Sequence, residues 1–220
     1  MIKCVNAGKY FTSFANENWA LKNINLEVDA GEFVSIVGRS GSGKSTLLHL
    51  IGGLDKVTQG NIYVNGNDVS KLSQKRLSEF KNKDVGFVFQ SFFLEPLYTV
   101  SENVELPLLL SDYTKEEKRE RVNECLEIVG MSEFAKRYVK TLSGGEKQRV
   151  SIARAIATNP TILLADEPCG NLDSSNTKTI MMLLRRLAQD GTTVLLVTHS
   201  DDDAMITDRM ITLLDGEIQP

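Results

Sequence analysis

A glycine-rich segment between two apolar runs limits the possible folds of this chain more than any other feature of the sequence. It fits the pattern G-x-x-x-x-G-K-S/T and, with the threonine that follows, comprises Gly38, Arg39, Ser40, Gly41, Ser42, Gly43, Lys44, Ser45 and Thr46. Residues 32–37 before it have the composition of a buried strand, and residues 46–51 open a helix pattern. Glycines let several backbone N–H groups point inward, and a helix N-terminus adds partial positive charge. The segment predicts a phosphate-binding loop and thus binding of a nucleoside triphosphate.

Two side chains of this loop have chemistry of their own. Lys44 can reach the β- and γ-phosphates, and the hydroxyl of Ser45 is placed to ligate Mg²⁺. An ordinary Gly/Ser-rich surface turn is the alternative interpretation. The strand and helix patterns on either side count against it.

A pair of carboxylates follows a second apolar run. Residues 162–165 read as a buried strand, and Asp166 and Glu167 come directly after it. At the end of a strand next to the phosphate loop, Asp166 can hold Mg²⁺ or its water. Glu167 can polarise an attacking water as a general base. The alternative is that both acids lie on a solvated loop.

Length and composition bound the class of protein. With 220 residues, 41% of them hydrophobic and 25% charged, the chain suits one globular α/β domain. Its net charge of −4 provides no electrostatic footprint for nucleic acid or an anionic membrane. The cysteines Cys4, Cys125 and Cys169 suggest neither a disulfide framework nor a zinc site, which fits a reducing cytoplasm.

Nothing in the sequence has the order of a secretory signal. The apolar runs fall far short of the roughly 18 residues that a membrane span needs. We therefore expect any membrane role to come through another chain.

Hydrophobic periodicity divides the chain into three kinds of segment. Alternation at 24–28 and 62–64, with a hairpin signal at 65–66, predicts a small antiparallel sheet. From about 91 to 150 the pattern is helical, with capping-box spacing between Thr114 and Glu117 and a stop at Gly130. Strand and helix patterns then alternate, which predicts a mostly parallel sheet. We expect one domain, 1–220, with its core in 1–90 and 151–220 and a helical subdomain at about 91–150.

Residues 142–146, Leu-Ser-Gly-Gly-Glu, form a further unusual string. Ser143 and Glu146 have capping-box spacing, so they can simply begin a helix. A capped helix does not require two adjacent glycines, however. Ser143, Gly144 and Gly145 at a helix N-terminus make a second anion site. Two chains that meet head to tail could use both sites on one nucleotide.

Taken in order, these motifs resemble those of the ATP-binding subunit of an ABC transporter, and the resemblance covers essentially the whole chain. It adds Gln90, the Asn-Leu-Asp string at 171–173 and His199 to the motifs above. The resemblance implies a P-loop NTPase fold of ABC type, ATP hydrolysis with Mg²⁺, and a second ATP-binding subunit. Each ATP would lie between Lys44 of one chain and Ser143–Gly145 of the other.

The resemblance also implies roles for single residues. Gln90 would touch Mg²⁺ and sense the membrane partner, and His199 would contact the γ-phosphate. Asp173 would cross the dimer interface. Either Tyr10 or Phe11 would stack on adenine, with Phe11 preferred, although both rings could belong to the core. Cys169 stands where the family usually has Thr or Ser. This departure puts only the local packing or the sensitivity to thiol reagents in question.

Local strings at 52–55, 86–90, 102–107 and 170–173 resemble one branch of the family, which includes macrolide and peptide exporters, lipoprotein-release systems and antimicrobial-peptide resistance pairs. This implies a permease contacted near Gln90 to Leu94, and a place at the cytoplasmic face of the membrane. Residues 92–94 could instead be three buried apolar residues. A regulatory ATPase that controls a cell-wall hydrolase is the main functional alternative. An ABC ATPase acting on DNA or ribosomes usually has inserts or zinc cysteines that this chain lacks.

Overall fold

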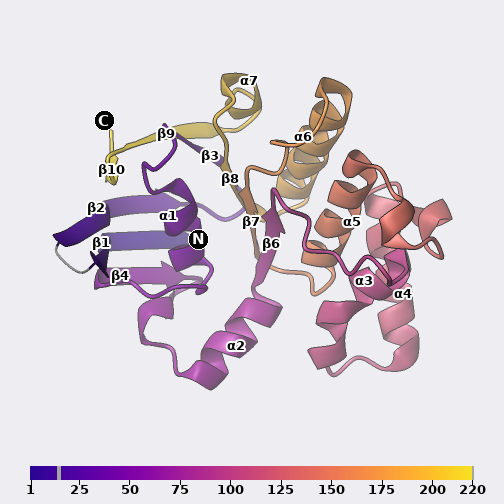
Figure 1. The fold of residues 1–220 in the computed structure, drawn as a ribbon. Coiled ribbons are helices and arrows are strands. Elements are labelled where there is room, and N and C mark those ends of the chain that lie inside the picture. The colour runs from indigo at the N-terminus through magenta and orange to yellow at the C-terminus, as the bar shows by residue number, and fades with distance from the viewer. Residues whose placement is uncertain (14–15, 220) are drawn as a thin grey trace.

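An antiparallel sheet forms the N-terminal side of the molecule in the computed structural model, which describes residues 1–13 and 16–219 (Figure 1). Its strands lie in the order β2-β1-β4-β5, with bounds β1 Ile2–Ser13, β2 Asn16–Val28, β4 Gln59–Val64 and β5 Asn67–Asp68. The alternation predicted at 24–28 holds, because Ile24, Leu26 and Val28 are buried while their neighbours are exposed. The small antiparallel sheet is confirmed.

A second, mostly parallel sheet forms the core. Its order is β10-β9-β3-β8-β7-β6, and every neighbouring pair is parallel except β9 with β10. The bounds are β3 Phe33–Val37, β6 Val85–Phe89, β7 Ile162–Asp166, β8 Thr193–Val197, β9 Arg209–Leu214 and β10 Glu217–Ile218. The expected α/β fold class with a mostly parallel sheet is therefore confirmed.

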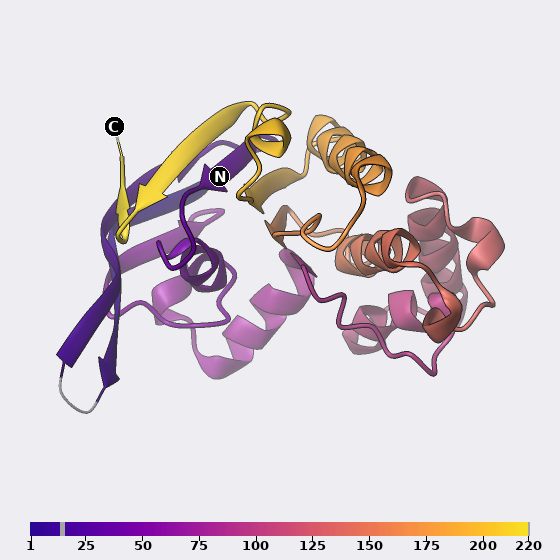
Figure 2. The same ribbon diagram turned by 45° about the horizontal axis from the view of Figure 1, so that its top comes forward.

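The helices are divided between the two sides of this core sheet, with α3 to α6 on one side and α1 and α2 on the side of the antiparallel sheet (Figure 2). Their bounds are α1 Lys44–Ile51, α2 Gln74–Lys83, α3 Val100–Glu105, α4 Lys115–Ile128, α5 Gly144–Ile156, α6 Ser174–Gln189 and α7 Asp201–Ala204. Short 3₁₀ turns are η1 Val69–Lys71, η2 Leu106–Leu110, η3 Ser132–Phe134 and η4 Val139–Thr141.

Helix α4 begins and ends at the residues that predicted its two ends. Thr114 and Glu117 form a complete capping box at the start of α4. Gly130, with φ +66°, follows the end of that helix. Helix α5 crosses the expected division at about residue 150, and the division itself stays a prediction. Among the described residues, no helix has the length and apolarity to cross a bilayer.

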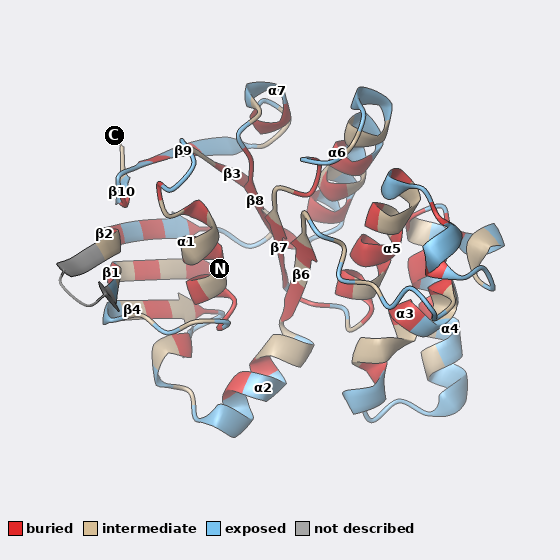
Figure 3. Ribbon diagram, viewed as in Figure 1, coloured by how far each residue is buried: buried red, intermediate tan, exposed pale blue. Residues whose placement is uncertain are grey.

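The strands of the core sheet are largely buried (Figure 3), and their alternate residues belong to two separate apolar cores. In β7, Leu163 joins the core made with α3 to α6, called here the helix-side core. Its neighbour Leu164 joins the core that includes β1, β2, β4 and α1, called the strand-side core. The same alternation runs through β8. One sheet thus separates two cores and fixes the edge at which its strands end.

Candidate nucleotide site

The predicted site residues collect at one edge of the core sheet, where its parallel strands end. The phosphate loop follows β3, Gln90 follows β6, Asp166 ends β7, and His199 comes shortly after β8. Ligands of open α/β sheets bind at the carboxyl ends of the strands. Strand order alone therefore brings these segments of distant sequence to one place.

Gly41 and Gly43 show why the phosphate loop needs glycine. Gly41 and Gly43 have φ of +80° and +102°, the left-handed region that favours glycine. A Cβ on Gly43 would also lie 2.4 Å from the carbonyl oxygen of Ala20. No side chain caps α1 at Gly43, so its first-turn N–H groups face the loop.

Lys44 is buried and turned back into this loop. Its ammonium donates to the carbonyl oxygens of Gly38 and Arg39, at 2.8 and 3.0 Å. Ser42 is 3% exposed, and its hydroxyl has no hydrogen-bond partner among the described residues. A buried hydroxyl without a partner calls for an explanation. An anionic ligand in the loop supplies one, and the residues present fit a triphosphate.

The three predicted metal ligands surround one cavity. Ser45, Gln90 and Asp166 line a space of about 260 Å³ together with Glu167. The hydroxyl of Ser45 donates to Asp166 Oδ1 at 2.9 Å. Burial raises the pKa of Asp166, and the hydrogen bond from Ser45 opposes that rise. Among the described residues no cluster of His, Cys, Asp or Glu forms a metal cage. Oxygen ligands of this mixed kind suit Mg²⁺ that is also held by phosphate.

Glu167 occupies a strained position between the other groups. Its φ of +47° is left-handed, and its amide donates to the carbonyl oxygen of Val197 at 2.9 Å. Strain of this kind costs on the order of 1–3 kcal/mol and clusters at functional sites. The carboxylate Oε2 lies 3.4 Å from His199 Nδ1. Glu167 also lines a second cavity with Lys44, so it borders the phosphate loop as well.

Two residues near Gln90 were not among the predicted site residues. The Gln90 amide donates to Asn171 Oδ1 at 3.4 Å. A Cβ on Gly170 would lie 2.7 Å from Gln90 Nε2. The sequence offers no signal for this contact, because the partners are 81 positions apart.

The predicted capping role of Ser143 is confirmed. Ser143 and Glu146 form a capping box at the start of α5, and its hydrogen bonds hold the pKa of Glu146 below the usual range. Within the described residues, the two cavities beside the phosphate loop include none of Ser143, Gly144 and Gly145. Their role as a second anion site stays a prediction.

Asp173 and the candidate adenine platform lie at the ends of other elements. Asp173 caps α6, and its Oδ1 accepts from the Asn176 amide at 2.9 Å. Tyr10 packs on Trp19 with ring centroids 5.1 Å apart, whereas Phe11 is 50% exposed. The Lys9 ammonium lies 5.0 Å from the centroid of the Phe11 ring. Phe11 remains the predicted platform because half of its surface is exposed.

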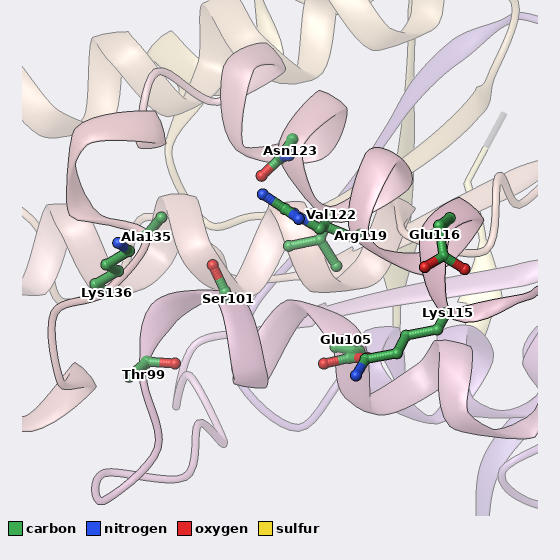
Figure 4. Close-up of a pocket in the computed structure, with 10 residues that line it drawn as sticks. All are labelled: Thr99, Ser101, Glu105, Lys115, Glu116, Arg119, Val122, Asn123, Ala135 and Lys136. Carbon is green, nitrogen blue, oxygen red and sulfur yellow. The ribbon is translucent and has the colours of Figure 1, made fainter.

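A separate cavity of about 590 Å³ lies between α3 and α4 (Figure 4). Its lining mixes Lys115, Arg119 and Lys136 with Glu105 and Glu116. It contains none of the predicted site residues. Size therefore does not identify the site here; the convergence of polar groups at the strand ends does.

Comparisons with known proteins agree with this geometry. Residues 21–170 match the family model described as ABC transporter. The chain is 47% identical over 224 residues to MJ0796 of Methanocaldococcus jannaschii, an uncharacterized ABC transporter ATP-binding protein, covering 100% of this chain and 95% of that one. It is 42% identical over 221 residues to LolD, the lipoprotein-releasing system ATP-binding protein of Francisella tularensis, covering 100% and 96%.

Solved structures show the same likeness. A dimeric structure of MJ0796 in a post-hydrolysis state, bound to ADP and Pi, superposes with a TM-score of 0.91 at 45% identity. That alignment covers 100% of this chain and 97% of the other. A further dimeric structure of MJ0796, described as a bacterial ABC transporter cassette, gives a TM-score of 0.92 at 46% identity.

Proposed function

Because this chain belongs to the ABC transporter family of ATP-binding subunits and hydrolyses ATP, we propose that it is the motor of a membrane complex. In this proposal two ATP-binding subunits close on ATP and reopen after hydrolysis. The motion drives a separate permease that exports, releases or senses a peptide, drug or lipoprotein. The similarity to LolD supports this branch of the family.

The observation that carries the proposal is that the start of α5, the predicted second anion site, is separate from the cavities at the start of α1. The start of α1 holds Lys44 beside Asp166 and Glu167, whereas Ser143 at the start of α5 lines neither cavity there. A second chain, identical or paralogous, would supply the α5 tip to each nucleotide. The solved structures of MJ0796 are dimers, which supports this arrangement.

The chemistry follows from residues already described. Lys44 would hold the β- and γ-phosphates, and Ser45, Gln90 and Asp166 would hold Mg²⁺. When bound, Mg²⁺ would offset the negative charge of the phosphate oxygens. Glu167 would accept a proton from the attacking water, a contribution of roughly 10²–10⁴ in rate. His199, 3.4 Å from Glu167, would meet the γ-phosphate beside it.

The segment after β6 is the proposed permease contact. Phe93 is 67% exposed, so residues 92–94 are not simply three buried apolar side chains. Beside it, a groove of about 290 Å³ separates α2 and β6 from η2 and α5, with Leu54, Phe87, Phe89 and Pro107 in its lining. An apolar groove next to an exposed phenylalanine suits a helix of the permease. This contact would hold the subunit at the cytoplasmic face of the membrane.

Replacing the proposed base tests the motor directly. We expect Glu167→Gln to keep ATP binding while turnover falls by roughly 10²–10⁴, so that a dimer accumulates at saturating ATP and Mg²⁺. Steady-state hydrolysis and light scattering after size exclusion measure the two effects. Glu116→Gln, an exposed glutamate of α4, is the control and should behave as wild type.

Two outcomes would contradict the proposal at different points. Hydrolysis at the wild-type rate in Glu167→Gln would remove Glu167 from the role of base. A Glu167→Gln protein that stays monomeric with ATP and Mg²⁺, alone and with its permease, would exclude closure of a dimer as the working step.

A further inference from the structure

Helix α5 is attached to the segment that follows β6 by side chains of its own. Arg154 donates to the carbonyl oxygens of Phe93 and Phe92, at 2.5 and 2.9 Å. Gln148, which is fully buried, donates to the carbonyl oxygen of Phe89 at 3.3 Å. These bonds span residues 89–93, called here the Gln90 segment, from its first residue to its last.

The Gln90 segment has little else to hold its main chain. Among the described residues, 91–94 make no backbone-to-backbone hydrogen bond. Phe93 has a left-handed φ of +46°, which a bulky residue adopts only under constraint. Its ring is mostly exposed and meets Phe89 edge-on, with centroids 5.1 Å apart. The guanidinium of Arg154 therefore supplies the donors that this turn needs.

Arg154 also links the proposed permease contact to the helix that carries the proposed dimer contact. It lines the groove of about 290 Å³ beside the Gln90 segment. At the far end of the same helix, Ser143, Gly144 and Gly145 form the tip that would meet the second chain. A rise of about 1.5 Å per residue places Arg154 some 15 Å from that tip, along a stiff rod.

We propose that Arg154 is a positioning residue that makes α5 and the Gln90 segment move as one body. A permease that displaces the Gln90 segment would then displace Ser143–Gly145, and so set whether the dimer can close. The guanidinium donates through two separate nitrogens held in one plane, Nη1 to Phe93 and Nη2 to Phe92, and a lysine ammonium has only one nitrogen with which to replace them. The effect on dimer closure rests on the proposed function, whereas the attachment of α5 to the Gln90 segment does not.

The chain contains a matched control for this interaction. Arg121 of α4 donates through Nε to the carbonyl oxygen of Ala157 at 2.9 Å, and through Nη2 to that of Ile156 at 2.6 Å. It thus grips the end of α5 by the same chemistry without touching the Gln90 segment. Arg121→Met should reproduce the cost in stability of Arg154→Met but not its effect on coupling.

The first experiment tests the attachment without a dimer. Limited proteolysis of the nucleotide-free protein with chymotrypsin, which cuts after aromatic residues, should show faster cleavage after Phe92 and Phe93 in Arg154→Met than in Arg121→Met. Arg154→Lys, which keeps the charge but loses the fork, should fall between them. Equal rates of cleavage after Phe92 and Phe93 in the two methionine variants would overturn the proposal, whether or not the protein dimerises.

The second experiment tests the consequence in the Glu167→Gln protein. We expect added Arg154→Met to raise the ATP concentration for half-maximal dimerisation by about tenfold, within the range of typical coupling energies. Binding of a fluorescent ATP analogue to the monomer should stay within about twofold, since Arg154 does not line the phosphate-loop cavity. An unchanged dimerisation midpoint would overturn the relay. A monomeric Glu167→Gln parent would instead count against the proposed function, and the proteolysis experiment would still decide the attachment.

Discussion

The adjacent glycines of the Leu-Ser-Gly-Gly-Glu string are required for different reasons. A Cβ on Gly145 would lie 2.0 Å from Asn176 Oδ1, and Asn176 is itself held by a 2.7 Å bond to Asp173 Oδ2. A Cβ on Gly144 would have Leu172 Cδ2 as its nearest neighbour, at 3.6 Å. Gly145 is therefore needed inside the chain, whereas space at Gly144 is left for something outside it.

This difference predicts that substitution of Gly145 lowers stability, whereas substitution of Gly144 weakens assembly of the dimer. We expect Gly145→Ala to lower the free energy of unfolding by roughly 1–3 kcal/mol, because Asn176 must leave Asp173 to make room. Gly144→Ala should unfold within about 0.5 kcal/mol of wild type and yet weaken ATP-driven dimerisation of the Glu167→Gln protein. Thermal unfolding and light scattering measure these effects. A stable Gly145→Ala protein with an intact dimer would contradict the steric argument.

At the residue scale, the sequence predicts the groups whose motif is contiguous. The phosphate loop and the Asp166–Glu167 pair follow from local spacing, since each motif sits directly at the end of a strand. Contacts between motifs do not follow. The Gly170 backbone beside Gln90 and the grip of Arg154 on Phe92 depend on strand order and helix placement, which no local pattern encodes.

Among the helices, α4 and α5 are the ones whose starts the sequence predicts, from the capping-box spacing of Thr114 with Glu117 and of Ser143 with Glu146. Thr99 and Glu102 form a capping box at the start of α3, but that helix was predicted only as part of the helical segment at about 91–150. Helix α2 was not predicted, although Ser73 caps it. Only Leu77 and Phe80 are buried along α2, so its apolar stripe is too short to register as a periodic pattern.

The capping boxes predict how α4 responds to acid. Hydrogen bonds from Thr114 hold the pKa of Glu117 below its ordinary value of 4.5. The stabilisation by this carboxylate is complete above that value and is lost as pH falls through the lower folded-state pKa. NMR titration should give Glu117 a pKa below that ordinary value.

Thr114→Ala provides the control, because it removes the capping hydroxyl but keeps the backbone N–H that donates to Glu117 Oε2. It should raise the pKa of Glu117 only part of the way toward its ordinary value and lower stability by about 1 kcal/mol. A wild-type pKa of Glu117 at or above its ordinary value would show that the capping bond does not persist in solution.

On the scale of the whole molecule, the helix-side and strand-side cores share one sheet. Successive residues of β7 and β8 enter opposite cores, so neither core can lose its packing without disturbing the strands of the other. The cysteines are distributed between them. Cys4 lies in the strand-side core, and Cys125 and Cys169 lie in the helix-side core.

The buried thiols therefore report on both cores at once. Burial raises the pKa of Cys4 and Cys169 to about 12 and that of Cys125 to about 11. We expect none of them to react readily with a thiol reagent at pH 8 in the native protein. In increasing urea, pulse labelling with mass spectrometry should show all three becoming reactive at one midpoint. Earlier labelling of Cys125 and Cys169 than of Cys4 would show that the helix-side core unfolds by itself.

The inward turn of Lys44 has a bearing on how loss-of-function variants would be interpreted. Its ammonium cross-braces the loop by holding the carbonyls of Gly38 and Arg39. A neutral side chain there would discard the brace together with the charge, leaving two carbonyls without a donor in a glycine-rich bend. If such a variant were inactive, the cause could be either a disordered phosphate loop or the loss of the positive charge that binds phosphate. The side chain of Glu167 does not hold the phosphate loop together in this way. A substitution of Glu167 is therefore easier to interpret as a direct effect on ATP hydrolysis.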